Sequence, residues 1–360
     1  MNKTSHLPSR FAAIDALRGI AALLVVWQHV AESFVQIPSI AQNGTFLADI
    51  SKQIDFGRIG IICFFLISGY VIPSSLTGNN RLKAIKKFSI RRFFRLYPAY
   101  WVSLALIIVL YQFIHVPVEN STILANTTML QSFFGKNHMI GLYWTLQVEL
   151  LFYTLCVLLF YGNKLNDAFF VFMLLVVLFV FFVIEQYLVN YTTLIHWSKE
   201  FQFLPYLLCV MLLGSLYRKV EQQGCLKSLK KYSYIGTFLC LGLPFFLLIS
   251  SLLGFHLATN AFRFGIAHTL AFLVFFIGIR YLKHAPKSLL WLGMISYSLY
   301  LFHPFVLYGT KFLIENSSFL ILKSQHLFVY LLIVGLLSIV LAALVYYVVE
   351  KPMIRFSKSC

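Results

Sequence analysis

Ionisable side chains inside long apolar runs are the residues of this chain best suited to chemistry. His29 and Glu149 each lie within such a run, and Arg91, Arg92 and Arg95 stand at the head of another, in RRFFRLYPAYW. Charges in lipid are expensive and are usually kept for a function. An imidazole can act as a general base or a nucleophile, and clustered guanidinium groups can bind a multiply charged phosphate.

Helical spacing relates these residues to two others. Arg18 and His29 are eleven positions apart, which places them about 20° apart around a helix and roughly 16 Å apart along it. Glu149 and His29 are expected at a similar depth, where the carboxylate can orient the ring. His303, in SYSLYLFHPF, reaches that level too. Structural alternatives are a snorkelling Arg18, a Glu149 that merely joins two helices, and a His303 that satisfies carbonyls freed by the next proline.

Composition places these residues in a membrane protein. The chain has 360 residues, of which 60% are apolar and 11% are charged. Its net charge of +17 arises from Lys and Arg between the apolar runs, a positive-inside pattern rather than a nucleic-acid footprint. The six cysteines form no CxxC pair, so we expect no metal site.

The apolar runs predict an all-α, polytopic membrane bundle of about ten transmembrane helices, with nine or eleven left open. We predict one integral membrane domain over residues 1–360. With both termini in the cytoplasm, 21 of the 29 basic residues fall inside. The longest irregular outer pieces are expected around 36–55 and 115–141, where an acceptor can dock. The predicted spans are 12–35, 56–77, 97–116, 142–161, 167–189, 203–217, 234–255, 261–280, 289–311 and 327–349.

Two further segments have a structural alternative. The basic residues between Arg81 and Lys87 are equally expected of a juxtamembrane patch that holds anionic lipid. The small-residue turn at Ser68 and Gly69 either breaks a helix or lets two helices approach closely, and we favour packing.

Six motifs in order resemble the acyltransferase 3 family of integral membrane acyltransferases, and together they cover the chain from its first span to its last. This resemblance implies transfer of an acyl group, usually acetyl, from cytoplasmic acyl-CoA to a hydroxyl group beyond the membrane. The motifs are IDALRGIAALLVVWQH at 14–29, FFLISGYVI at 64–72, RRFFRLYPAYW at 91–101, WTLQVELLFY at 144–153, LGMISYSLYLFHPF at 292–305 and EKP at 350–352.

The resemblance also implies roles for individual residues. His29 and Glu149 match family positions and are the expected catalytic pair. Arg18, Arg92 and Arg95 also match family positions and are expected to bind the donor, together with Arg91, whose helical spacing lets it reach the same phosphate. Sequence leaves open whether the acyl group passes directly to the hydroxyl or first to His29. The expected supporting residues are Ser68, Tyr297, Tyr300 and His303.

We therefore expect an O-acetyltransferase of the bacterial inner membrane, with acetyl-CoA or another acyl-CoA as donor. The expected acceptor is an extracytoplasmic saccharide such as O-antigen, lipopolysaccharide or exopolysaccharide. The expected partners are membrane lipid, this saccharide or glycolipid, and a separate extracytoplasmic protein if transfer is not completed in the membrane domain; no nucleic acid is expected. The alternatives are a transporter or flippase of a lipid-linked saccharide, or a family member acting on peptidoglycan or lipid.

Overall fold

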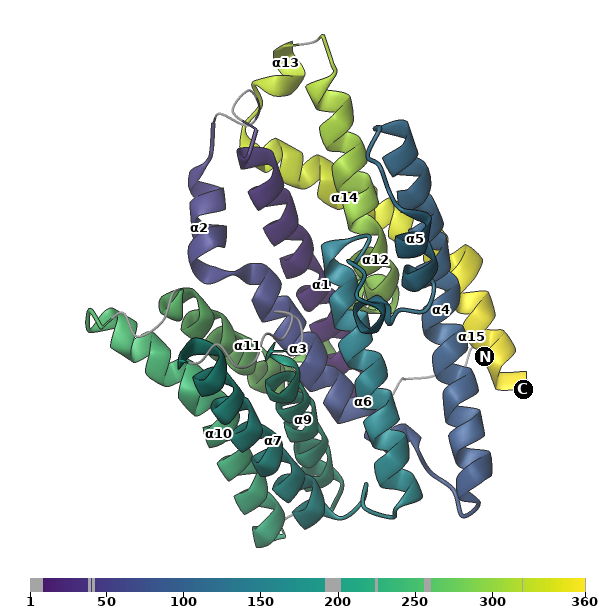
Figure 1. The fold of residues 1–360 in the computed structure, drawn as a ribbon, viewed down its shortest axis with the longest axis vertical. Coiled ribbons are helices and arrows are strands. Elements are labelled where there is room, and N and C mark those ends of the chain that lie inside the picture. Colours follow the sequence, from purple (N-terminus) through teal and green to yellow (C-terminus); the bar gives the residue numbers. More distant parts are fainter. Residues whose placement is uncertain are drawn as a thin grey trace. The chain divides into compact units, whose positions relative to one another are not determined.

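The computed structural model of the chain describes residues 9–37, 40, 43–191, 202–223, 226–255, 260–318 and 320–359. Across these ranges the regular elements are helices, shown in Figure 1, with one isolated β-bridge between Asn43 and His326. Nine helices of this described part are long and apolar enough to cross a membrane. The predicted fold class, a polytopic helical membrane bundle, is confirmed.

The described part of the chain consists of long helices and of shorter helical elements that lie between or after them. The shorter elements are α2 (Phe46–Ile54), η1 (Pro73–Ser75), α5 (Asn120–Asn126), η2 (Gln131–Phe134), η3 (Gly141–Tyr143), η4 (Leu282–His284), α13 (Leu320–Lys323), the π-helical turn η5 (Tyr346–Glu350) and α15 (Lys351–Ser359). The long helices are α1 (Ser9–Val35), α3 (Phe56–Val71), α4 (Arg81–Phe113), α6 (Trp144–Tyr161), α7 (Ala168–Tyr191), α9 (Leu204–Gln223), α10 (Lys227–Leu252), α11 (Ala261–Tyr281), α12 (Lys287–Glu315) and α14 (Leu327–Val345).

The sixth predicted span, 203–217, is a helix but does not belong to the nine. It corresponds to α9, whose second half carries Arg218, Lys219 and Glu221 and is too polar to qualify. Helix α9 packs against α6, α7 and α10, and most of its first half is buried. A helix surrounded by other helices needs less apolar surface than one surrounded by lipid.

The basic segment before the third predicted span is helical rather than a loop. Helix α4 begins at Arg81, sixteen residues before the expected span, and runs without a break through Pro98 to Phe113. The charged residues between Arg81 and Arg95 are good helix formers, and the segment contains no glycine. Arg91, Arg92 and Arg95 therefore have fixed helical positions.

Residue contacts divide the chain into two compact units, each made of separate stretches of sequence. The first unit takes in residues 1–63, 90–143 and 273–360. At its centre α1 packs against α12 and α14, and α12 packs against α14. The helices α1 and α12 cross so closely that a Cβ on Gly293 would lie 1.9 Å from the carbonyl oxygen of Asp15. Only a glycine fits at this position. The prediction of a single domain stays a prediction.

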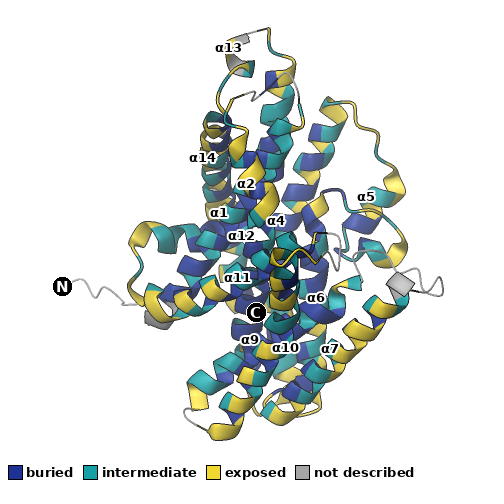
Figure 2. Cartoon of the chain, turned by 90° about the vertical axis from the view of Figure 1, so that its left-hand side faces the viewer, coloured by how far each residue is buried: buried dark blue, intermediate teal, exposed yellow. Residues whose placement is uncertain are grey.

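The second unit takes in residues 64–89 and 144–272. A Cβ on Gly69 would lie 1.8 Å from the carbonyl oxygen of Met211, so the small-residue turn of α3 serves close packing against α9, as predicted. Large apolar side chains such as Phe181 of α7 and Phe238 of α10 are exposed, and Figure 2 shows exposed positions along these helices. Exposed apolar side chains on such helices suit a lipid surface.

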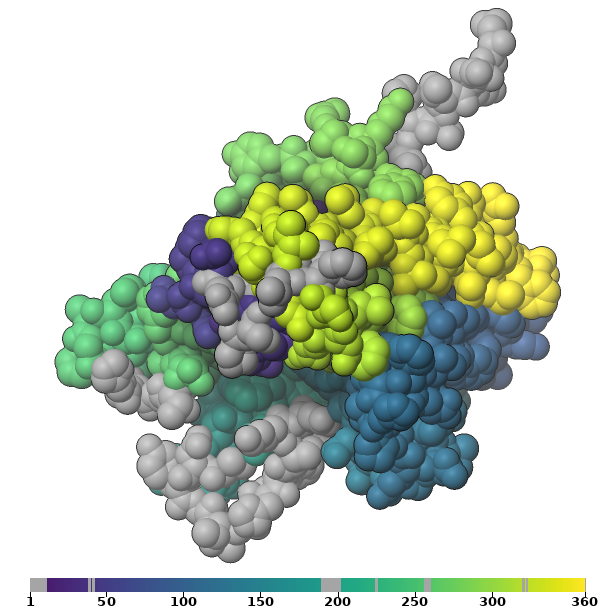
Figure 3. All heavy atoms as spheres, turned by 90° about the horizontal axis from the view of Figure 1, so that it is seen from above, coloured from purple at the N-terminus to yellow at the C-terminus, as the bar shows by residue number. Residues whose placement is uncertain are grey.

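The two outer pieces expected to be irregular contain helical elements among their described residues, so that expectation was wrong. The first contains α2, and Asn43, just before α2, pairs with His326 at the start of α14. Figure 3 shows the purple residues around α2 next to yellow-green residues of the later chain. The second contains α5, η2 and η3. Apolar runs do not predict these elements, because they are too short to cross a membrane.

The second piece folds back along α4. Tyr97, Tyr100 and Tyr111 of α4 donate hydrogen bonds to the carbonyls of Thr128, Asn126 and Met139, at 3.0, 2.6 and 2.9 Å. Since Tyr97 lies sixteen residues before the end of α4, the segment returns over roughly 24 Å of helix.

An ion pair closes the exposed end of the same piece. Lys136 Nζ lies 2.9 Å from Glu119 Oε2, and hydrogen bonds from Lys136 and Ser121 lower the pKa of that exposed carboxyl group.

Candidate active site

His29 of α1 and His303 of α12 form a hydrogen-bonded pair. Nδ1 of His29 lies 2.8 Å from Nε2 of His303, and the two ring planes are nearly parallel, at 15°, with their centroids 5.1 Å apart. His303 is fully buried, and its Nδ1 lies 3.2 Å from the carbonyl oxygen of Leu299. The sequence predicts both histidines at one level, and in the structure they are in contact.

The hydrogen bonds of this pair determine where the protons of the two neutral rings reside. A carbonyl oxygen only accepts, so Nδ1 of His303 donates to Leu299 and Nε2 of His303 must accept. Nδ1 of His29 therefore carries the proton that it donates to His303. The unprotonated nitrogen of His29 is then Nε2, whose lone pair can take a proton or attack a carbonyl carbon.

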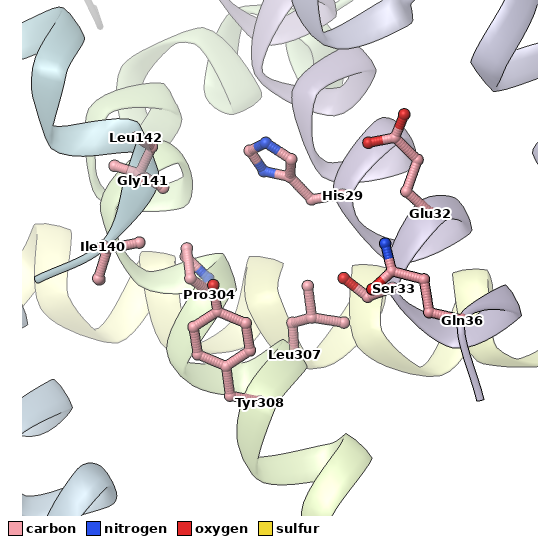
Figure 4. Close-up of a pocket in the computed structure, with 10 residues that line it drawn as sticks. All are labelled: His29, Glu32, Ser33, Gln36, Ile140, Gly141, Leu142, Pro304, Leu307 and Tyr308. Carbon is pink, nitrogen blue, oxygen red and sulfur yellow. The ribbon is translucent and has the colours of Figure 1, made fainter. Parts of the chain in front are cut away.

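His29 lines a cavity of about 160 Å³. Figure 4 shows its ring extending from α1 toward Leu142 and Pro304. Helix α1 supplies the polar wall, and α12 supplies an apolar and aromatic wall. The complete lining is His29, Glu32, Ser33, Gln36, Ile140, Gly141, Leu142, Pro304, Leu307 and Tyr308.

Tyr297 and Tyr300 hold α12 in place rather than lining the cavity. Tyr297 donates to the carbonyl of Leu96 on α4 at 2.8 Å, and Tyr300 donates to the carbonyl of Leu142 at 3.2 Å. Ser103 of α4 adds a hydrogen bond to the carbonyl of Leu301 at 3.1 Å. These contacts fix the helix that carries His303 against the cavity wall.

The predicted donor-binding arginines differ in their surroundings. Arg91 is exposed, whereas Arg92, Arg95 and Arg18 are half-buried. The positive charges of Arg18 and Arg95 act on two carboxylates that sequence analysis did not assign to the site, Asp15 and Glu350.

Glu350 comes from the π-helical turn η5 and accepts a 2.8 Å hydrogen bond from Ser298. It is buried, so its charge needs the nearby arginines. Asp15 could have been found from the sequence as a second charged residue three positions before Arg18, whereas Glu350 lies far from both arginines along the chain.

Glu149 and Ser68 belong to the second unit, and their predicted roles stay predictions. Glu149 accepts a 2.5 Å hydrogen bond from Tyr153, one helical turn further along α6. Ser68 is buried beside the packing site at Gly69. The observed hydrogen-bond partner of the His29 ring is His303.

Glu32 is a site residue that sequence analysis missed. It lines the cavity one turn after His29, and Gln28 donates a 2.6 Å hydrogen bond to its Oε1. The available signal was its spacing: His29, Glu32, Ser33 and Gln36 follow the i, i+3, i+4, i+7 pattern of one helix face.

Metal-ligating residues do not gather in groups of three or more within the described ranges. Four cysteines, Cys63, Cys156, Cys209 and Cys240, are buried thiols, whereas Cys225 and Cys360 lie outside the described residues.

Comparisons with known proteins identify the family of the chain. The family model for the acyltransferase domain, acyltransferase 3, matches residues 11–347. Over 119 residues the chain is 29% identical to the peptidoglycan O-acetyltransferase OatA of Listeria monocytogenes serovar 1/2a, a match that covers 32% of this chain and 16% of that protein. No solved structure matches the chain. The chain therefore belongs to the acyltransferase 3 family.

Proposed function

We propose that the protein transfers an acetyl group from cytoplasmic acetyl-CoA to a hydroxyl group of an extracytoplasmic glycan, in the inner membrane of a bacterium. The observation that carries this proposal is the His29–His303 hydrogen bond, which leaves Nε2 of His29 unprotonated beside a cavity. An imidazole in this state can accept a hydroxyl proton at neutral pH.

The donor is proposed to bind nearer to the N-terminus of α1 than His29. Arg18 is eleven residues before His29, roughly 16 Å along the helix. We assign the phosphates of CoA to Arg18, Arg92 and Arg95, with Arg91 at the exposed edge. The carboxylates of Asp15 and Glu350 attract Arg18 and Arg95, and the phosphates of the donor compete with these carboxylates for the guanidinium groups.

The acyl group is transferred by one of two routes. In the direct route, Nε2 of His29 takes the hydroxyl proton while the acceptor oxygen attacks the thioester carbonyl. The carbon–sulfur bond breaks, and the imidazolium returns the proton to the departing thiolate. In the covalent route, Nε2 itself attacks the carbonyl and the thiolate leaves. The acceptor hydroxyl then cleaves the acyl-imidazole bond, and its proton passes through the imidazole to the thiolate, which restores neutral His29.

Two glycan classes are proposed as acceptors. Surface polysaccharides, including O-antigen, lipopolysaccharide and exopolysaccharide, present hydroxyl groups outside the membrane. Peptidoglycan is the second class, favoured by the name of the peptidoglycan O-acetyltransferase that matches part of this chain. Both classes can be isolated from the same cells and examined together.

The test compares cells that lack the gene with cells that express the wild type or His29→Ala. O-acetyl groups on purified surface polysaccharide and peptidoglycan are quantified by NMR. We expect O-acetylation with the wild type and at least a hundredfold less with His29→Ala. His284→Ala, at an exposed histidine of η4, is the matched control and should behave like the wild type. Full O-acetylation by a normally abundant His29→Ala protein would refute the proposal.

A further inference from the structure

The cavity beside His29 has two chemically different walls. Glu32 and Ser33 of α1 and Gln36, just after it, present a carboxylate, a hydroxyl and an amide on one side of the cavity. Opposite them lie Leu307 and Tyr308 of α12. A sugar ring has the matching division, because its hydroxyl groups project from an edge while its carbon–hydrogen face packs on apolar and aromatic surface. The wall chemistry fits a saccharide better than a lipid chain.

The exposure of the α1 wall changes along its length. His29, Glu32 and Ser33 are half-buried, and Gln36, just beyond the end of the helix, is exposed. The cavity thus leads from the end of α1 toward His29. Its volume of about 160 Å³ is below the about 300–1,000 Å³ of sites for drug-sized ligands. One ring fits such a volume, and the rest of a glycan must remain outside.

The charges around the cavity select among sugars. Glu32 is the charged residue of the lining, and Gln28 holds it through a hydrogen bond to its Oε1. No cation belongs to the described cavity lining. The carboxylate of Glu32 can accept hydrogen bonds from the hydroxyl groups of a ligand in the cavity. The same carboxylate repels a negatively charged ligand there.

We propose that this cavity is the acceptor subsite and that it takes a single uncharged sugar residue, with Glu32 accepting hydrogen bonds from its hydroxyl groups. The inference rests on the proposed function and adds the substrate class to it. It excludes uronic acids, sialic acids and phosphate-bearing sugars as the residue that receives the acyl group. The Tyr308 side of the cavity packs on the face of the ring.

The first test locates the acyl group on the natural glycan. Cells with and without the gene are compared, and the O-acetylated residue is identified by NMR of the purified glycan. We expect the acyl group on an uncharged hexose or N-acetylhexosamine. An O-acetyl group on a uronic acid, a sialic acid or a phosphate-bearing residue would overturn this inference alone. No gene-dependent O-acetylation at all would remove the proposed function, and the subsite with it.

The second test separates the acceptor subsite from the donor site. Glu32→Gln weakens hydroxyl binding, and Ser33→Phe fills the cavity by a different means. Both variants should lower glycan O-acetylation at least tenfold, while the purified proteins bind radiolabelled acetyl-CoA within twofold of the wild type. Glu315→Gln, at an exposed carboxylate of α12, is the matched control and should retain O-acetylation. Loss of acetyl-CoA binding in both variants, or full O-acetylation by either one, would overturn the assignment.

Discussion

Replacing Gly293 by alanine tests whether the packing of α1 on α12 sets the geometry of the histidine pair. A Cβ at this position would lie 1.9 Å from the carbonyl oxygen of Asp15 and 2.4 Å from its carbonyl carbon. Both atoms belong to helix backbone, so no side-chain rotation relieves the clash. The helices must separate, because ordinary van der Waals contact begins at 3.4 Å.

The required shift is about 1.5 Å at the crossing. His303 is ten residues further along α12, about 15 Å away, and helices transmit such displacements as nearly rigid bodies. If half of the shift reaches the histidines, their 2.8 Å contact lengthens beyond the about 3.5 Å limit of a hydrogen bond. A misplacement of this size costs about 100-fold in rate, or about 2.7 kcal/mol of transition-state stabilisation.

The assay measures O-acetyl groups on glycan per molecule of protein in the membrane, with protein abundance determined by immunoblotting. Gly309→Ala on the same helix and Gly335→Ala on α14 are matched controls, because no heavy atom lies within 4 Å of a Cβ at either position. Both controls should stay within about twofold of the wild type. Wild-type activity per molecule in Gly293→Ala would show that the crossing does not set the geometry of the site.

Three further predictions address the partner histidine, the folded-back segment and the orientation. His303→Leu leaves Nδ1–H of His29 without its acceptor, so acyl transfer per molecule of protein should fall about 5- to 100-fold. His303→Gln should recover part of the activity, because its amide oxygen can accept this hydrogen bond. Equal loss in both variants would count against the assigned proton positions. Asn126→Ala removes hydrogen bonds to Thr122, Asn137 and Met139, so the free energy of unfolding should fall by about 2–3 kcal/mol, measured by thermal unfolding in detergent. Asn316→Ala, at an exposed position, should change it little. Equal unfolding of the two variants would show that Asn126 does not anchor the folded-back segment. Ser33→Cys in a cysteine-free background should react with an impermeant maleimide in intact cells, whereas Lys164→Cys should react only after permeabilisation; the reverse pattern would invert the predicted orientation.

The fold class was readable from the sequence because lipid imposes one strong condition on every span. A run of about 20 apolar residues must form a helix, since no water is present to satisfy its backbone. The limits of α4 and the ordered 116–143 segment were not readable in this way. Charged residues can extend a helix beyond the bilayer, and the carbonyls bound by Tyr97 and Tyr111 carry no signal in the sequence.

In the candidate site, too, the sequence indicates some features and tertiary structure decides the others. Sequence alone selected His29, His303 and the arginines, because ionisable groups in apolar runs stand out by their cost. Tertiary structure decided which atoms meet: His303 binds His29, Ser298 binds Glu350, and Glu32 shares the cavity with Tyr308. Those pairings join residues from different helices, and their geometry depends on how closely glycines such as Gly293 let the helices approach. Periodicity within one helix places a side chain on a face, whereas only the packing of that face determines its partner.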